Sequence, residues 1–163
     1  MAGFTSPARS LAITTSTAKN GATTDINLAN QYNEKACNGG NAHACTNQGY
    51  NYEKGEGYPK NEYRAAQLYK KACDIGHALG CRNQASMYDR GAGVTQNKYT
   101  ARRLYQQACT GGDSSGCGSL GNYMYLGLGG AKDVNGGIAK LRDACRRNNT
   151  WSCNKLSSYG YSK

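Results

Sequence analysis

The stretch that decides the fold is Ala65-Ala66-Gln67-Leu68-Tyr69-Lys70-Lys71-Ala72-Cys73, which is followed eight residues later by Cys81. Both cysteines recur every 36 residues, so the chain contains four Cys-x7-Cys units in one register. The eight positions are Cys37, Cys45, Cys73, Cys81, Cys109, Cys117, Cys145 and Cys153. Self-similarity at a fixed period of this length is typical of repeat architectures.

Three further features keep the same register. An alanine precedes the first cysteine of each unit, at Ala36, Ala72, Ala108 and Ala144. A Gly-x-Gly bend recurs at Gly55-Glu56-Gly57, Gly91-Ala92-Gly93 and Gly127-Leu128-Gly129. An Asp or Asn, which is a preferred helix N-cap, recurs at Asp25, Asn61, Asn97 and Asp133.

Apolar spacing predicts two helices in each unit. After Asn61 the apolar residues return at intervals of three and four, as one face of a helix requires, and glycine tolerates the bend between helices. We therefore predict an all-α solenoid of about four 36-residue helix-turn-helix repeats. The expected helices lie near 26–37, 42–53, 61–73, 78–89, 97–109, 114–126, 134–146 and 150–161.

This pattern resembles the Sel-like repeats, which are relatives of the tetratricopeptide repeats. The match is best from Ala65 to Gly93 and covers about 25–161, and the paired cysteines resemble those of the cysteine-rich secreted bacterial branch. Gly136-Gly137-Ile138 departs from the pattern and predicts a weaker helix there without altering the fold. The resemblance implies a helical solenoid that acts as a protein-binding scaffold outside the cytoplasm.

Two uses of the cysteines compete, namely metal binding and disulfide formation. Structural zinc usually takes cysteines two to four residues apart, which Cys-x7-Cys does not provide. The resemblance also points to disulfides, with the pairs Cys37–Cys45, Cys73–Cys81, Cys109–Cys117 and Cys145–Cys153. Four such bonds would imply an oxidising compartment, either the periplasm or the outside of the cell. No metal and no cofactor is expected.

The charge is uneven along the chain. The formal net charge is +10, of which residues 1–81 carry +2 (8 basic, 6 acidic) and residues 82–163 carry +8 (12 basic, 4 acidic). A basic half favours an acidic partner, although it also suits a solvated surface. Nucleic acid is a less favoured partner, because an oxidised, exported protein seldom meets it.

Residues 1–24 are polar and lie outside the repeats, so we divide the chain into this segment and a solenoid over 25–163. No apolar run approaches the length of about 20 residues needed to span a bilayer, and the N-terminus lacks the apolar core of a signal peptide. The alternation in Ser10–Thr15 is a weak strand signal. If ordered, this segment would lie along its own solenoid or against a neighbouring subunit.

Few motifs point to catalysis. His43 and His77 lie 34 residues apart, off the repeat register, and are expected as partly exposed side chains in loops. Ser16-Thr17-Ala18-Lys19 matches the Ser-x-x-Lys motif of penicillin-binding enzymes, but no Ser-Asp-Asn or Lys-Thr-Gly accompanies it. We expect no enzyme and no catalytic residue.

The leading hypothesis is a non-enzymatic exported scaffold that binds a protein partner and could inhibit it. The alternatives are a self-assembling subunit of an extracellular filament, whose partners are other copies of the chain, and a penicillin-binding or weak β-lactamase-like activity. Tyrosine and arginine are favoured in binding hot spots. The candidate contacts are Tyr50, Tyr52, Tyr88, Tyr123, Tyr125, Arg102, Arg103, Arg146 and Arg147.

Overall fold

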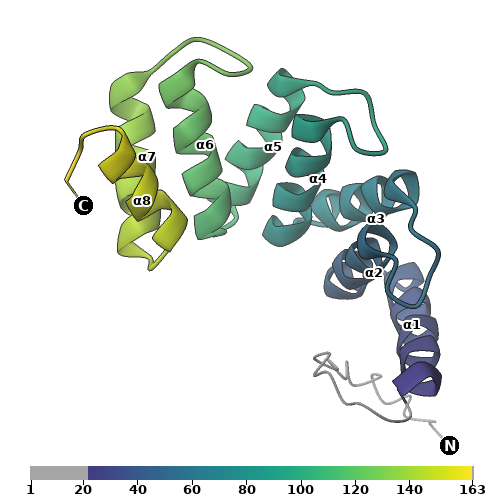
Figure 1. The fold of residues 1–163 in the computed structure, drawn as a ribbon. Coiled ribbons are helices and arrows are strands. Elements are labelled where there is room, and N and C mark those ends of the chain that lie inside the picture. Colours follow the sequence, from purple (N-terminus) through teal and green to yellow (C-terminus); the bar gives the residue numbers. More distant parts are fainter. Residues whose placement is uncertain (1–21, 163) are drawn as a thin grey trace, which may run out of the picture.

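The computed structural model describes residues 22–162, which form eight helices that follow one another along an arch (Figure 1). No strand occurs within this range. The helices are α1 (Ala22–Asn38), α2 (Ala42–Lys54), α3 (Glu62–Asp74), α4 (Ala78–Arg90), α5 (Lys98–Thr110), α6 (Ser114–Leu126), α7 (Val134–Arg146) and α8 (Thr150–Ser158). The predicted all-α solenoid of four helix pairs is confirmed.

The outermost helices differ from the prediction at one end each. Helix α1 begins at Ala22, so Asp25 lies inside the helix and is not its N-cap. Helix α8 ends at Ser158, three residues before the expected 161. It stops there because Gly160 adopts a left-handed backbone with φ of 81°, which turns the chain away from the helical path.

The predicted N-caps at the other three register positions are confirmed. Asn61 has an extended backbone and its side chain accepts a hydrogen bond from the backbone N–H of Arg64 at 2.9 Å. Asn97 and Asp133 cap α5 and α7 in the same way. Each cap satisfies one of the free N–H groups at a helix start, which stabilises the helix by about 1 kcal/mol.

The Gly-x-Gly bends have positive φ values, as expected, and they also pack closely. Gly91 and Gly93 have φ of 71° and 66°. A Cβ on Gly93 would lie 2.2 Å from the carbonyl oxygen of Glu62, so this turn rests directly on the first turn of α3. The bend therefore needs glycine both for its conformation and for its contact.

The four predicted disulfides are present. Each joins the end of an odd-numbered helix to the first turns of the next even-numbered helix, with Cα–Cα distances of 4.3–4.8 Å. Six of the eight cysteines are buried, while Cys145 and Cys153 are partly exposed. No free cysteine remains among the described residues.

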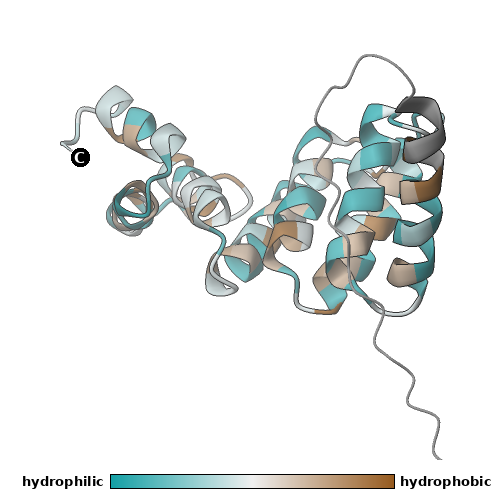
Figure 2. Cartoon of the chain, turned by 90° about the horizontal axis from the view of Figure 1, so that it is seen from below, coloured by the Kyte–Doolittle hydropathy of each residue, from teal (hydrophilic) through white to brown (hydrophobic). Residues whose placement is uncertain are grey.

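The two sets of helices form two layers. Even-numbered helices of successive repeats contact one another, whereas no two odd-numbered helices do within the described range. The even-numbered helices therefore line the inner side of the solenoid, and the odd-numbered helices line the outer side. Figure 2 shows that hydrophobic residues occupy short segments of the helices, with hydrophilic residues between them.

Neighbouring helices pack in two ways. The disulfide-joined pairs, such as α3 with α4, share a smaller contact than the pairs without a disulfide, such as α4 with α5. The broadest contact is between α6 and α7, where Gly121 and Gly137 allow the backbones to approach: a Cβ on either residue would lie 2.7 Å from the other's carbonyl oxygen. The predicted weakness at Gly136-Gly137 is thus offset by close packing.

Candidate protein-interaction surfaces

One helical stripe of the inner layer faces solvent. On α2 its members His43, Asn47, Tyr50 and Lys54 follow one another at intervals of three and four residues, and all are exposed. The 36-residue register carries the stripe onto the later even-numbered helices. We call this set the inner stripe; its further members are Leu79, Asn83, Ser86, Arg90, Ser115, Ser119, Asn122, Leu126, Trp151, Lys155 and Ser158.

The inner stripe combines exposed aromatic rings with cations. Tyr50 is 45% exposed and the ammonium group of Lys54 lies 5.7 Å from its ring centre. At the other end of the solenoid Trp151 is also 45% exposed, and Lys155 lies 5.7 Å from its ring. The stripe itself contains no Asp or Glu, and its charged side chains are Lys54, Arg90 and Lys155.

Beneath the inner stripe lies a network of carboxylates and tyrosines. The hydroxyl of Tyr69 donates to Glu53 at 2.8 Å, and Arg90 pairs with the same carboxylate at 2.9 Å. One repeat later, Asp89 accepts a hydrogen bond from the Tyr123 hydroxyl and pairs with Lys98. These bonds cross from one repeat to the next and hold the inner layer together.

Burial in this network changes the acidity of the tyrosines. Burial, together with the hydrogen bond to Glu53, raises the pKa of Tyr69 well above its usual value. Burial and the hydrogen bond to Asp89 raise the pKa of Tyr123 in the same way. Burial, and secondarily the charge of Asp89, raises the pKa of Tyr105 to about 12.

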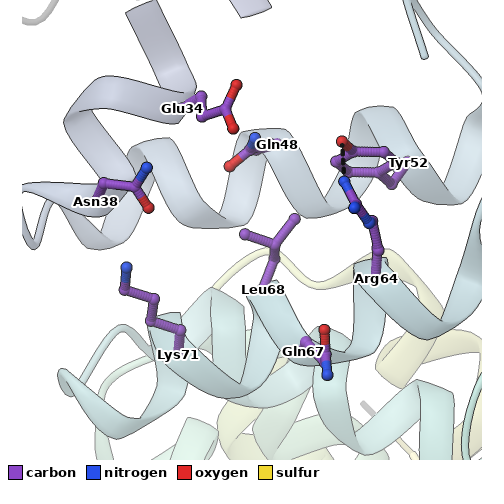
Figure 3. A pocket seen from close by; sticks show the side chains of 8 residues that line it. All are labelled: Glu34, Asn38, Gln48, Tyr52, Arg64, Gln67, Leu68 and Lys71. Carbon is purple, nitrogen blue, oxygen red and sulfur yellow. Dashed lines mark hydrogen bonds between the residues drawn. The ribbon is translucent and has the colours of Figure 1, made fainter. Parts of the chain in front are cut away.

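Two open grooves are each lined by at least one odd-numbered helix together with an even-numbered helix. The first has a volume of about 310 Å³ and is bounded by α1, α2 and α3 (Figure 3). In it the guanidinium of Arg64 donates to the Tyr52 hydroxyl at 3.1 Å, while Glu34 and Lys71 lie on opposite walls. The second groove has a volume of about 360 Å³ and is lined by residues of α5, α6 and the loop after α6.

The predicted tyrosine contacts do not form one surface. Tyr50 is exposed on the inner stripe, whereas Tyr52 and Tyr123 are 9% and 4% exposed. Tyr88 packs against the core, and the ring of Tyr125 stacks on Tyr159 at a centroid distance of 3.8 Å. Whether any of these five residues touches a partner stays a prediction.

The four arginines that were predicted as contacts also lie in two different parts of the protein. Arg102 and Arg103 both line the second groove, and Arg102 donates to the backbone oxygen of Ala131 at 2.9 Å, which anchors the loop before α7. Arg146 and Arg147 are exposed at the end of α7, where Arg147 pairs with Asp143 at 2.8 Å. Their role in binding stays a prediction.

The sequence interpretation did not select two tyrosines of the outer layer. Tyr63 and Tyr99 are 61% and 69% exposed and stand at the same register position, the second residue of α3 and α5. The sequence signal that could have identified them is their position in the first turn of a helix, shortly after the N-caps Asn61 and Asn97. Trp151 was missed as well, because the fourth unit has no aromatic residue in register with Tyr50.

The two histidines meet across the repeat boundary. Their ring centres are 4.2 Å apart, and the Nδ1 atom of His77 lies 2.7 Å from the Thr46 hydroxyl. His43 lies in the first turn of α2 and not in a loop, while His77 is the N-cap residue of α4. Burial, and secondarily the charge of His43, lowers the pKa of His77.

Other expectations concern metals, membranes and the N-terminal segment. Among the side chains that the structure describes within residues 22–162, no group of three or more His, Cys, Asp or Glu is placed to hold a metal ion. Over the same range no helix is long and apolar enough to cross a bilayer. The Ser16–Lys19 motif and the strand expected over Ser10–Thr15 lie outside the described residues.

Known structures share this arrangement. The chain is 29% identical to a protective antigen of uropathogenic Escherichia coli that displays an SLR fold (TM-score 0.78), and the match covers 84% of this chain and 30% of that one. A Sel1 repeat protein from Oxalobacter formigenes is 29% identical (TM-score 0.75), with 81% of this chain and 54% of that one covered. The chain therefore spans about a third and about half of these two proteins.

A third similar structure is cysteine rich protein B of Helicobacter pylori, which is 27% identical (TM-score 0.66), with 84% of this chain and 98% of that one covered. No curated protein matches the chain. The family model of the Sel1 repeat matches residues 18–41, 42–77 and 78–113, which together make up more than half of the sequence. With this match and with the helix pairs described above, the chain belongs to the Sel1 repeat family.

Proposed function

We propose that this protein is a non-enzymatic exported scaffold whose inner stripe binds a segment of another protein. The proposal rests on the alignment of the stripe. Its members recur at equivalent positions of the 36-residue repeat on α2, α4, α6 and α8. Helical repeat proteins commonly use such continuous concave surfaces for extended partners. The inner stripe runs over four successive even-numbered helices, which suits an extended peptide segment.

The chemistry of the stripe favours an acidic, extended segment. Lys54 and Lys155 supply positive charge near the two ends, and no carboxylate of the stripe opposes them. The exposed side-chain amide of Asn47 can both donate to and accept from a peptide backbone. Tyr50 and Trp151 supply the aromatic area that concentrates binding energy at hot spots.

The disulfides support export to the periplasm or beyond the cell. Disulfide bonds form and persist in oxidising compartments and are rare in a reducing cytosol. All cysteines of the described residues are paired, which suits a protein that works where such bonds are stable.

The test compares exposed aromatic residues of the two layers. The full chain is first used to select binding peptides from a displayed library that contains both acidic and neutral sequences. Binding of the selected peptide is then measured for Tyr50→Ala, Trp151→Ala, Tyr63→Ala and Tyr99→Ala. We expect the two inner-stripe variants to weaken binding by about tenfold or more, because removal of a hot-spot residue costs roughly 1–2 kcal/mol.

The outer-layer variants are matched controls, since Tyr63 and Tyr99 are at least as exposed as Tyr50. Their affinities should stay within about twofold of wild type. If Tyr63→Ala or Tyr99→Ala weakened binding more than Tyr50→Ala, the outer layer would be the binding surface and the proposal would be wrong.

A further inference from the structure

The N-cap residue of α4 departs from the pattern of the other helices. In α2, α3, α5, α6, α7 and α8 the N-cap is an Asn or Asp whose side chain accepts a hydrogen bond from a backbone N–H of the first turn. His77 holds this position in α4 and its side chain makes no such bond. Departures of this kind from a chain's own local pattern are expected at functional or strained sites.

The side chain of His77 contacts the preceding repeat instead. Its ring centre lies 4.2 Å from that of His43, and the two rings are tilted by 59°. The same two register positions meet again at α6 and α8, where the side chain of Asn149 donates to the Ser115 hydroxyl at 2.9 Å. The repeat geometry therefore brings these positions into direct contact, and at α2 and α4 both of them are histidine.

The hydrogen bonds of Thr46 determine which nitrogen of the His77 ring carries the hydrogen. The Thr46 hydroxyl donates its single hydrogen to the carbonyl oxygen of Ala42 at 3.0 Å, so it acts as the acceptor in its 2.7 Å contact with Nδ1 of His77. Nδ1 therefore carries the hydrogen of the neutral ring, and Nε2 keeps a lone pair. A hydrogen bond from one ring nitrogen to an oxygen is typical of histidines that bind a metal through the other nitrogen.

The surroundings of the two rings suit a bound cation. Burial, and secondarily the charge of His43, lowers the pKa of His77, which keeps this ring neutral at pH 7. The carboxylate of Asp113 acts on the pKa in the opposite direction, so it supplies negative charge near the ring, and it pairs with Arg82 at 3.2 Å. His43 is exposed, so its ring is free to turn toward an ion beside His77.

We propose that His43 and His77 bind one first-row transition-metal ion, such as Cu²⁺, Ni²⁺ or Zn²⁺, with water in the remaining coordination positions. Imidazole nitrogen suits these metals, and Cu²⁺ binds such ligands most tightly. Two imidazoles on one ion, at metal–nitrogen distances of about 2.0–2.1 Å, have ring centres about 4.5–5 Å apart, so the rings need to separate by less than about 1 Å. The ion would link α2 to α4 at one end of the inner stripe, and the site requires no partner protein.

Copper titration of the oxidised full chain tests the site, because His43 and His77 are the only histidines of the sequence. The variants His43→Ser and His77→Asn introduce the residues that hold the same positions at α6 and α8, so both should keep the helical signal in circular dichroism. We expect the wild type to bind one Cu²⁺ and each variant to bind it at least roughly tenfold more weakly, because two linked ligands gain affinity that a single ligand lacks.

Two further measurements identify the ligands as the two rings. Electron paramagnetic resonance of bound Cu²⁺ should show two ring nitrogens in the wild type and one in either variant. The affinity of the wild type should be lost as the pH falls below about 6, because a protonated imidazole cannot bind a metal and the usual pKa of histidine is about 6.5.

Two outcomes would overturn the proposal. Equal Cu²⁺ affinities of the wild type and both variants would assign the ion to other groups, such as carboxylates or the terminal amine. Two ions in the wild type, with one of them kept at unchanged affinity in each variant, would show that the rings bind separately and do not form one site.

Discussion

The two kinds of helix joint in this protein differ in what holds them. The joints at α1/α2, α3/α4, α5/α6 and α7/α8 carry a disulfide and a smaller contact, while those at α2/α3, α4/α5 and α6/α7 carry a broader contact and no covalent bond. The disulfides therefore lie at the joints where the two helices contact each other less broadly. The two kinds of joint alternate along the chain, so each helix from α2 to α7 has one disulfide-linked neighbour and one neighbour held by packing alone.

The broad joints achieve their contact by different means. At α2/α3 the small residue Gly49 admits the ring of Tyr69, which is fully buried. At α6/α7 the position of Tyr69 is taken by Leu141, and glycines on both helices bring the backbones together. The repeat spacing is thus the same at the two joints, although different side chains occupy the equivalent positions.

The largest expected effect is the loss of the disulfide joints. Each bond closes a short loop and contributes about 2–3 kcal/mol, so complete reduction removes on the order of 10 kcal/mol, comparable with the whole stability of a typical domain. We expect full reduction to unfold the protein, as followed by circular dichroism. Cys145–Cys153 should be reduced first, because it is the one bond with both sulfur-bearing residues partly exposed.

Timed alkylation and mass spectrometry would give the order of reduction. Early loss of a buried bond such as Cys109–Cys117 would contradict this expectation, and a reduced protein that kept its helical signal would show that the broad joints suffice alone.

A smaller effect is expected from a cavity in a broad joint. Leu141 is fully buried beside Gly121, and Leu141→Ala should lower the free energy of unfolding by about 2–5 kcal/mol. The matched control is Leu126→Ala on the neighbouring helix, where the leucine is 48% exposed and the loss should be below about 0.5 kcal/mol. Denaturant unfolding of the oxidised proteins measures both values, and similar losses would mean that this joint is not the tighter one.

The smallest difference between variants is expected at alkaline pH, where the tyrosines of the inner network ionise. Burial raises the pKa of Tyr69, Tyr105 and Tyr123 above that of an unfolded tyrosine, which is near 10. Their contribution is therefore complete below about pH 10; the part due to Tyr105 is lost as the pH rises through about 12, its folded-state pKa, and the parts due to Tyr69 and Tyr123, whose pKa values are raised further, are lost at higher pH. For Tyr105 alone this loss approaches about 3 kcal/mol.

Stability measured between neutral pH and about pH 12 should thus fall, and Asp89→Asn should make the fall shallower, because Asp89 raises the pKa of both Tyr105 and Tyr123. Asp143→Asn, at an exposed pair with Arg147, is the control and should keep the wild-type slope. If stability fell with pH at the same slope in all three proteins, the inner network would not contribute to stability in the way expected here.

The repeat register made most of the fold predictable. Eight cysteines in one period fixed the units, and glycine and Asn or Asp at fixed positions marked the turns, so the helices between 42 and 146 were placed within one residue of their observed bounds. The start of α1 was missed because Asp25 has the register of an N-cap, although the helix continues through it. Local sequence alone does not show that a preferred cap residue is bypassed.

The candidate surface was less predictable, because a helix pattern does not tell which layer a residue faces. Tyr50 and Tyr52 are two positions apart on α2, yet one is exposed on the inner stripe and the other is buried against α3. The exposure of Tyr63 and Tyr99 depends on the odd-numbered helices lying apart on the outer side. That spacing follows from the curvature of the whole array and is absent from any single repeat.

The short disulfide loops also bear on how the chain would respond to a pulling force. Each bond holds residues that are eight positions apart at a Cα–Cα distance below 5 Å, whereas the same residues could span about 27 Å when extended. Stretching the oxidised chain from its two ends would therefore separate the helices at the broad joints. The four disulfide-linked turns between the paired helices would stay closed. A scaffold built in this way would lengthen in steps of one helix pair. Each disulfide-linked turn would keep its two helix ends together, ready for refolding.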